Sequence, residues 1–144
     1  MIDALRWMLP LVGAWQLSGH PDGAALADAA SDYAVPVSLM WAIAYEETRH
    51  DITNTPVSRA GAVGRMQVMP HYWRWQCGPL WGHRRYAANV ACGALILRYY
   101  LSSCREDTRC AAWHYVGGDS RYARRVGFKS LVYELQMAVA ARGD

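Results

Sequence analysis

The chain has 144 residues but only one lysine, Lys129, and one phenylalanine, so arginine supplies nearly all of its positive charge. It contains no low-complexity tract, internal repeat or linker, and this absence excludes a disordered protein and a repeat array. No apolar run reaches the ~20 residues that a membrane-spanning helix needs, so we expect no integral membrane span. The length is short for two domains and sufficient for one domain with a buried core.

The charge of the chain says little about its partners. Hydrophobic residues make up 53% of the sequence and charged residues 19%, which is typical of a compact globular protein. The net charge of +3 suits an anionic polymer. Arginines cluster at Arg84–Arg85 and at Arg121, Arg124 and Arg125, where they fit solvated helix faces as well as a nucleic-acid patch. No recognised binding motif accompanies them, so we expect no nucleic-acid partner.

The four cysteines lack the spacing of a zinc site, because none of them forms a Cys-x-x-Cys pair. The five histidines show no His-Glu-x-x-His pattern, and we expect no metal and no cofactor. Four cysteines allow three complete disulfide pairings. Proximity in the sequence favours Cys104 with Cys110 and, with it, Cys77 with Cys92, although Cys92 also fits a buried thiol in a helix. Two disulfides would suit an oxidising periplasm or exterior.

Helical periodicity dominates most of the chain, and strand alternation is hardly visible. We therefore predict an all-α (mainly α) domain with one short irregular hairpin around Thr53 to Gly64. Pro36 is a typical helix start, and Gly61 and Gly64 suit a loop that shapes a cleft. The predicted helices are Ala24–Tyr33, Val37–Thr48, Met66–Trp73, Tyr86–Ser102, Cys110–Val116 and Ser120–Ala141.

The N-terminal run Trp7–Leu17 is apolar and has two interpretations. A signal peptide is one, but Pro10 interrupts the run and the nearest Ala-x-Ala, Ala25–Ala27, falls inside a predicted helix. The other is a retained helix that packs on the domain or on a partner, and we favour this one. The expected organisation is an N-terminal helix and turn over residues 1–23, followed by the main domain over residues 24–144.

Tryptophan and tyrosine are unusually frequent, with seven and nine residues respectively. Each combines a flat apolar face with a polar edge, so it can cover a sugar ring and also donate a hydrogen bond. Four of them lie close after Pro70, namely Tyr72, Trp73, Trp75 and Trp81. For any one of these rings ordinary packing is the favoured interpretation, and a carbohydrate-binding surface near this segment is the alternative.

Glu47 ends an apolar helix and is a candidate for a catalytic acid, although periodicity alone does not choose between it and Glu46. Residues at helical spacing form one apolar stripe: Pro36, Met40, Ile43, Ala44 and Glu47. The opposite side carries Ser38, Trp41, Tyr45 and Thr48. A carboxyl group on the apolar side loses hydration, which raises its pKa and suits a general acid. Glu46 lies near the same face, and both acids could instead cap the helix or pair with Arg49.

The residues after this helix narrow the interpretation, because their order resembles the soluble lytic transglycosylase family of lysozyme-like, peptidoglycan-cleaving domains. That family has a helix Ala-Ile-Ala-x-x-Glu-Ser, and here Ala42–Thr48 matches it with Glu47 at the acid and Thr48 in place of Ser. The family continues with Ser-x-x-Gly-Ala-x-Gly-Leu-Met-Gln-x-Met-Pro. The stretch Ser58–Pro70 matches it except at Arg65, where Leu is common.

Three further blocks follow in the order of the family. Asn89–Leu97 is similar to its Asn-Ile-x-x-Gly-x-x-Tyr-Leu helix. Cys110–Gly118 stands in the place of Ala-Ala-Tyr-Asn-x-Gly, from which Trp113-His114-Tyr115 departs, and Tyr122–Val126 looks like the closing Tyr-Ala-x-x-Val helix. Together the blocks span about Asp28 to Val132, which makes the resemblance specific.

The resemblance implies a lysozyme-like fold and an activity. The expected reaction cleaves the β-1,4 bond between N-acetylmuramic acid and N-acetylglucosamine in peptidoglycan glycan strands and forms a 1,6-anhydro end. Glu47 would be the single catalytic acid, since Asp51, one turn further, would not reach across the sugar. The implied substrate-binding residues are Ser58, Met66 and Gln67, together with Trp113, His114 or Tyr115 as the ring that orients Glu47.

Two other functions stay open at this point, namely a hydrolytic lysozyme of the goose type and an inactive lysozyme-like module that binds the wall. We expect the protein in the periplasm or at the cell wall, secreted or carried by a phage particle. An envelope secretion assembly is the other setting in which short domains of this kind occur.

Overall fold

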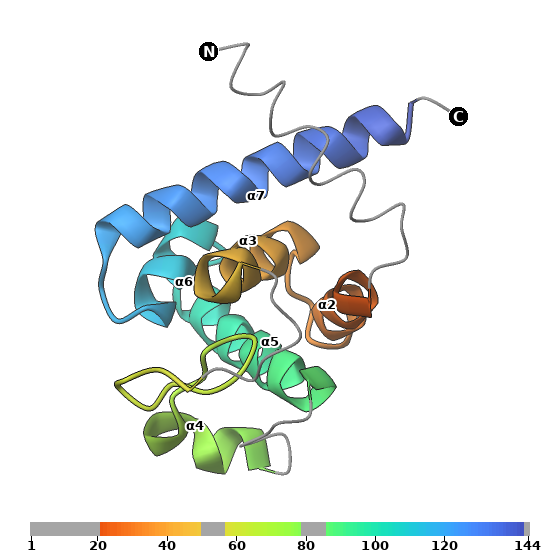
Figure 1. Cartoon of the computed structure of the whole chain (residues 1–144). Coiled ribbons are helices and arrows are strands. Elements are labelled where there is room, and N and C mark those ends of the chain that lie inside the picture. Colours follow the sequence, from red (N-terminus) through yellow and green to blue (C-terminus); the bar gives the residue numbers. More distant parts are fainter. Residues whose placement is uncertain (1–20, 50–56, 79–85, 143–144) are drawn as a thin grey trace.

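A computed structural model describes residues 21–49, 57–78 and 86–142 of the chain. Within these ranges the protein is built from helices that pack around one core (Figure 1). The predicted N-terminal helix Trp7–Leu17 lies outside the described residues. The helices are α2 (Pro21–Asp32), α3 (Val37–Thr48), α4 (Pro70–Cys77), α5 (Tyr86–Ser103), α6 (Thr108–Tyr115) and α7 (Ser120–Ala140). The prediction of an all-α fold is confirmed.

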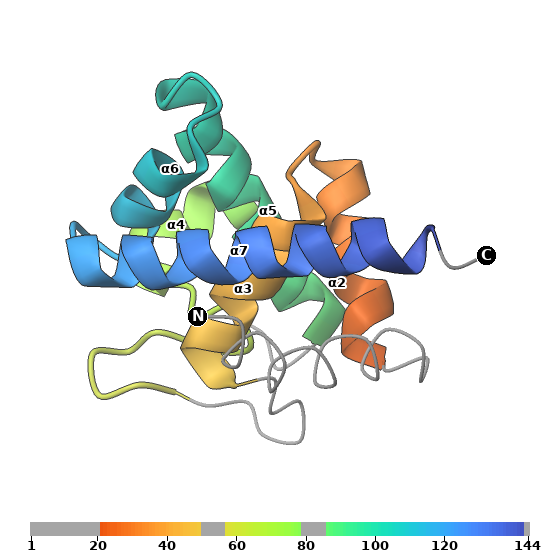
Figure 2. The ribbon, with the colours of Figure 1, turned by 90° about the horizontal axis from the view of Figure 1, so that it is seen from above.

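Helix α3 is the central element, because every residue from Ser38 to Ala44 is buried. A helix that is buried all round needs packing partners on each side. Helix α7 crosses one side of α3, and α2 packs on another (Figures 1 and 2). The side of α3 opposite the predicted apolar stripe is also buried in the first two turns of the helix. There the hydroxyl of Ser38 donates to Oε1 of Glu134 at 2.7 Å, and Trp41 packs on Tyr133.

The end of α3 is fixed by a backbone reversal at Arg49. Arg49 has a φ of +53° in the left-handed region, and its N–H donates to the carbonyl of Tyr45. Such a reversal closes the last turn of a helix and satisfies one of its free carbonyls. The last turn of α3 therefore holds Glu46 and Glu47 in a defined place on the helix.

Helix α7 is the longest helix of the described part and packs on both α3 and α6. Its start is capped by Asp119, whose carboxylate accepts hydrogen bonds from the N–H groups of Arg121 at 2.7 Å and Tyr122 at 3.1 Å. An acidic N-cap satisfies free N–H groups and interacts well with the helix dipole. Tyr122 is thereby fixed in the first turn of α7.

Most predicted helix bounds agree with the structure to within three residues. The exception is the helix predicted over Met66–Trp73, which instead runs from Pro70 to Cys77. Pro70 stands at the first position of α4, where proline is favoured because its missing N–H has no helical partner anyway. The preceding residues form antiparallel bridges, Val57 with Val63 and Val63 with Val68. The described part of the predicted hairpin is thus confirmed, but it ends later than Gly64.

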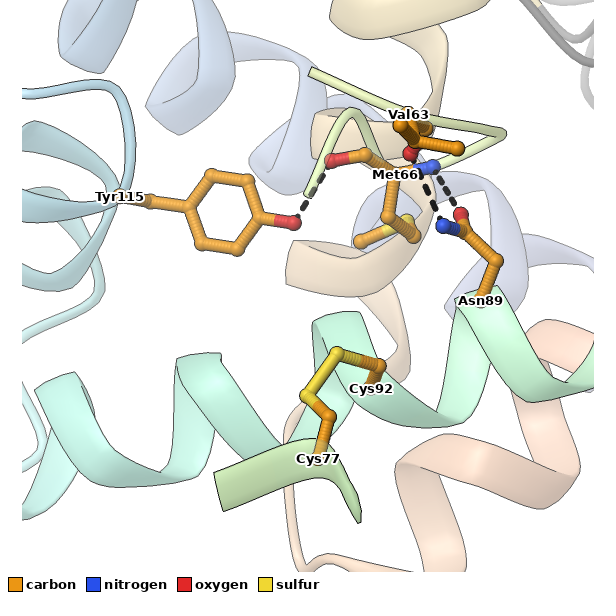
Figure 3. Close-up of a disulfide and its surroundings, with 6 residues drawn as sticks. All are labelled: Val63, Met66, Cys77, Asn89, Cys92 and Tyr115. Atoms are coloured by element: carbon orange, nitrogen blue, oxygen red, sulfur yellow. Dashed lines mark hydrogen bonds between the residues drawn. A yellow bond between two sulfur atoms is a disulfide. The ribbon is translucent and has the colours of Figure 1, made fainter. Parts of the chain in front are cut away.

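Both predicted disulfides are confirmed. Cys77 at the end of α4 joins Cys92 in α5, with a Cα–Cα distance of 5.3 Å (Figure 3). Cys104 joins Cys110 across the turn between α5 and α6, with a Cα–Cα distance of 5.8 Å. In the described ranges, no helix combines the length and the apolar character that crossing a membrane requires.

The disulfides give a first testable prediction. We expect thiol titration of the unfolded, unreduced protein to find no free thiol. Replacing both Cys77 and Cys92 by alanine should lower the free energy of unfolding by about 3 kcal/mol, because their loop of 15 residues is then no longer closed in the unfolded chain. Replacing Cys104 and Cys110, whose loop spans 6 residues, should cost about 2 kcal/mol. Urea unfolding of the two double variants tests the order of these losses. Four titratable thiols in the unreduced wild-type protein would contradict the disulfides themselves.

Candidate active site

Glu47 lies in the last turn of α3 and faces the start of α7. Its Oε1 accepts a hydrogen bond of 2.5 Å from the hydroxyl of Tyr122. Burial is the largest influence on Glu47 and raises the pKa of its carboxyl group, and the charge of Glu46 raises it further. The Tyr122 hydrogen bond and the charge of Arg65 act in the opposite direction without cancelling the effect of burial. Glu47 therefore holds its proton closer to neutral pH than an ordinary glutamate does.

Tyr122 is suited to be the donor in this pair. Its burial, together with the neighbouring charge of Glu47, strongly raises the pKa of the phenol. The hydroxyl therefore stays protonated and can direct its hydrogen towards the carboxyl group. Because Tyr122 occupies one oxygen of Glu47, the second oxygen is left as the atom that can exchange a proton with a ligand.

Glu46 has the opposite environment, although it is the next residue. Its side chain is 4% exposed and pairs with Arg125 at 2.9 Å and with the ammonium group of Lys129. Burial alone would raise the pKa of Glu46, but the hydrogen bonds and charges of these two cations lower it. Glu46 is thus an ionised residue that ties α3 to α7. The two adjacent acids therefore differ in environment: the pKa of Glu47 is raised, as a general acid requires, and the pKa of Glu46 is lowered.

The predicted pairing of the acids with Arg49 is wrong. The guanidinium group of Arg49 lies over the ring of Tyr45 instead, 5.0 Å from its centre. This contact is a cation–π interaction at the surface and leaves both glutamates to the partners on α7.

The loop between the bridge residues Val63 and Val68 includes Gly64 and Gln67 and brings Met66 towards the core. Gly64 has a φ of +79°, and a side chain at this position would begin 2.5 Å from the side chain of Asn89. The amide of Asn89 spans the loop: its Oδ1 accepts from the N–H of Met66 at 2.8 Å, and its Nδ2 donates to the carbonyl of Val63 at 2.9 Å (Figure 3). The side chain of Asn89 therefore links this loop, residues 64–67, to α5, and we call it the site loop.

The predicted substrate-binding residues Ser58, Met66 and Gln67 have different surroundings, and only the last two lie in this loop. Met66 is fully buried. Gln67 is half-buried, and its Nε2 donates to the carbonyl of Gly64 at 2.9 Å. The hydroxyl of Ser58 accepts from the N–H of Ala62 at 3.0 Å and so closes the turn of its own loop.

Tyr115 connects this loop to α6. Its hydroxyl donates to the carbonyl of Met66 at 2.7 Å (Figure 3). Burial strongly raises the pKa of Tyr115, with a smaller contribution from the charge of Glu47, so the phenol remains a neutral donor. The ring predicted to orient Glu47 was expected among Trp113, His114 and Tyr115, but the ring that bonds to Glu47 is Tyr122.

A cavity of about 630 Å³ opens beside Gln67 and Tyr115. Glu47 is not part of its wall, but Tyr115 is, and the charge of Glu47 acts on Tyr115. Its lining is dominated by aromatic rings and contains two glutamine side chains. The lining residues are Gln67, Val68, Met69, Tyr72, Trp73, Gln76, Ile96, Tyr99, Tyr100, His114, Tyr115, Val116 and Gly117.

Three rings of the cavity wall, those of Trp73, Tyr100 and His114, contact one another in sequence. Trp73 meets Tyr100 edge to face at 5.7 Å, and Tyr100 stacks on His114 at 5.3 Å. Trp113 packs against His114 at 4.8 Å but lines a separate hollow of about 320 Å³. Of the aromatic residues expected near a sugar, Trp73 lies in the cavity wall, as does Tyr72.

Tyr122, Tyr99 and Tyr100 are the site residues that the sequence did not single out. Tyr122 belongs to the closing motif Tyr122–Val126, so a signal was present, but nothing in the sequence assigned it a contact with Glu47. Tyr99 and Tyr100 sit in a helical pattern without a distinctive spacing. Only the packing of α4 and α6 on α5 makes them part of a cavity wall.

One group of metal-binding residue types comes together in the described ranges. Donor atoms of Cys104, Cys110 and His114 lie within 4.8 Å of one another. The two sulfurs are bonded to each other, however, and a disulfide sulfur lacks the thiolate charge that a metal ligand needs. The site around Glu47 holds a carboxyl group with a raised pKa, and such a group can transfer a proton.

Comparisons with known proteins identify the family and the fold of the chain. A family model, the transglycosylase SLT domain, matches residues 25–130. A crystal structure of the lytic transglycosylase Slt from Pseudomonas aeruginosa, an inactive mutant with glutamine in place of a glutamate, is similar with a TM-score of 0.57 and 19% identity. The similarity covers 92% of this chain but 26% of that one and shows a shared fold. No curated protein sequence matches the chain.

Two glycines test how the site loop is held. Gly64→Ala places a side chain against Asn89 and also forces alanine into a left-handed conformation, whereas Gly61→Ala, with a φ of +91°, meets no atom within 4 Å. We expect Gly61→Ala to cost about 1–2 kcal/mol of stability from the backbone alone. Gly64→Ala should cost a further 1–3 kcal/mol or so, because the loop must move. Equal losses in urea unfolding would contradict the role of the Asn89 contact.

The two glutamates give opposite predictions for the dependence of stability on pH. Glu47 has a raised pKa in the folded protein. Its contribution to stability is therefore lost as the pH rises from about 4.3, the pKa of an unfolded glutamate, through the raised pKa of the folded state. Glu47→Gln removes this loss, and its urea midpoint at pH 7 should exceed that of the wild type. Near pH 4 the two midpoints should converge.

Glu46 is the matched control, since its folded pKa is lowered. Its stabilising effect is present above the pKa of an unfolded glutamate and disappears as the pH falls. We expect Glu46→Gln to lower the free energy of unfolding at pH 7 by about 1–3 kcal/mol, because Lys129 and Arg125 lose a charged partner. If Glu46→Gln raised the stability at pH 7 and Glu47→Gln lowered it, Glu46 rather than Glu47 would be the residue with the raised pKa.

Proposed function

Because the chain belongs to the transglycosylase SLT domain family, we propose that it is a lytic transglycosylase of peptidoglycan. The proposed reaction cleaves the β-1,4 bond between N-acetylmuramic acid and N-acetylglucosamine and leaves a 1,6-anhydro-N-acetylmuramic acid end. The observation that carries this proposal is the placement of Glu47: it is a buried carboxyl group with a raised pKa, held by Tyr122 at the end of α3.

The proposed mechanism uses one carboxyl group for both proton transfers. Most glycosidases use two carboxylates. Here the adjacent Glu46 is engaged by Arg125 and Lys129 and is not available as a second one. Glu47 first donates its proton to the leaving glycosidic oxygen while the N-acetyl group of the substrate stabilises the cationic carbon. Glu47 then takes the proton of the C6 hydroxyl, whose oxygen closes the anhydro ring, and so returns to its starting state.

Tyr122 contributes orientation to both steps. Its hydrogen bond fixes the carboxyl plane and favours the carboxylate that exists between the two transfers. A positioned phenol can do this without accepting the proton itself, because its own pKa is far above the working pH.

The proposed substrate-binding surface runs from the site loop to the aromatic cavity. Gln67 supplies a side-chain amide for the sugar, Met66 shapes the floor of the loop, and Ser58 fixes the turn that precedes them. His114 and Tyr115 line the cavity, whose rings suit the apolar faces of neighbouring sugars. Trp113, in contact with His114, extends this aromatic surface.

We also propose where the protein acts. Two disulfides favour an oxidising compartment, and the proposed substrate lies in the periplasm or cell wall. The protein would work there as a free enzyme or as part of a phage particle or an envelope secretion assembly.

The proposal is tested by digesting purified peptidoglycan and identifying the products by mass spectrometry. We expect muropeptides with 1,6-anhydro ends, which are lighter by one water than lysozyme products. Glu47→Gln should lower turnover at least 10²-fold, because a general acid typically contributes 10²- to roughly 10⁴-fold. Glu46→Gln, assayed where it is folded, should keep most of the activity.

Each other result has a definite meaning. Mainly reducing muramic ends would show a hydrolase that uses the same acid. An absence of products from the wild-type protein would favour a wall-binding module. Loss of activity in Glu46→Gln but not in Glu47→Gln, with matched circular dichroism, would move the acid by one position.

A further inference from the structure

Arg65 is a buried cation next to the proposed acid. It lies in the site loop directly before Met66, and it is 3% exposed. Its guanidinium group reaches the end of α3, where Nη1 donates to the carbonyl of Ala44 and to the hydroxyl of Thr48. Ala44 and Thr48 bracket Glu47 within the last turn of the helix.

The contact between the loop and α3 runs in both directions. The hydroxyl of Thr48 lies 3.2 Å from the carbonyl of Ala44 and 3.3 Å from the carbonyl of Arg65, within hydrogen-bond distance of each. Both the backbone and the side chain of Arg65 are therefore joined to the turn that carries Glu47. A movement of the loop at Arg65 must move this turn as well.

The place of the Arg65 side chain, at the C-terminal end of α3, favours a cation, although packing there does not require one. The carbonyl groups at a helix C-terminus carry partial negative charge, which stabilises a nearby positive group. Burying a guanidinium group still costs desolvation energy, and an apolar side chain of similar volume often packs as well or better. A charge retained at such a cost points to a role for the charge itself.

We propose that Arg65 is a positioning residue: it fixes the last turn of α3 and supplies a permanent positive charge beside the carboxyl group of Glu47. This inference rests on the proposed function of Glu47. In the reaction, the carboxylate that forms when Glu47 gives up its proton would lie near this charge and be stabilised by it.

The other groups that face Glu47 do not provide such a charge. Tyr122 on α7 and Tyr115 on α6 are neutral phenols with raised pKa values. Glu46 on α3 is negative and raises the pKa of Glu47, although Arg125 and Lys129 pair with it. Among the charged described residues that act on Glu47, Arg65 is the one that lowers its pKa.

The test compares variants of the full chain at position 65. Arg65→Leu and Arg65→Gln remove the charge, and Arg65→Lys keeps it. The midpoint of Glu47 titration is measured directly from its carboxyl carbon by NMR, and turnover of peptidoglycan is measured against pH. In both neutral variants we expect the midpoint to rise by about one unit or more, and the alkaline limit of activity should rise with it. In Arg65→Lys both should move by less than half as much.

Thr48→Val is the matched control for the hydrogen bonds alone. It removes the hydroxyl that Arg65 contacts and leaves the charge in place, so the midpoint should stay within about 0.3 unit while amide exchange in the last turn of α3 becomes faster. An unchanged Glu47 midpoint in a folded neutral variant would overturn the proposal, and Arg65→Gln serves if Arg65→Leu does not fold. A wild type that cleaves nothing, but in which Arg65→Gln shifts the midpoint, would refute the proposed function and retain the inference about Arg65.

Discussion

The hydrogen bond between Tyr122 and Glu47 is the contact on which the proposed site depends, because it joins the last turn of one helix to the first turn of another. Both turns must be fixed for the bond to persist. Arg49 closes the end of α3 by its left-handed backbone, and Asp119 caps the start of α7 with its carboxylate. The extended packing of α3 on α7 then sets the distance between them. The acid is thus placed by helix ends rather than by a flexible loop.

The loop that faces the acid gains its order from α5. Asn89 pairs with the backbone of Val63 and Met66, and Gly93, one turn further along α5, leaves room for Met66, since a side chain there would begin 2.7 Å from the Cβ of Met66. The Cys77–Cys92 disulfide adds α4 to the same support (Figure 3). Because the bridges that precede α4 are isolated, side-chain contacts rather than a sheet hold this segment.

The sequence was sufficient where local rules decide the structure. The bounds of α3 follow from Pro36 and the apolar run, and the two disulfides follow from proximity along the chain. It was insufficient where residues meet across helices. The contact of Tyr122 with Glu47 spans 75 positions, and the wall formed by Trp73, Tyr100 and His114 comes from three different helices. Helical periodicity also failed to predict which sides of α3 face the core. From Ser38 to Ala44 the helix is buried on all sides, so it has no polar face there for the pattern to show.

The pKa values of two adjacent glutamates shift in opposite directions because their neighbours differ in charge. Glu46 meets two cations from α7, and this pairing holds it ionised despite its burial. Glu47 meets a neutral phenol, so the effect of burial prevails and its pKa is raised. If Tyr122 were replaced by a cation, Glu47 would become a second structural ion pair and could no longer act as an acid at neutral pH. Arg65 lies between these limits: it donates to the carbonyl of Ala44 and the hydroxyl of Thr48, on either side of Glu47, and it lowers the pKa of Glu47 without cancelling the effect of burial.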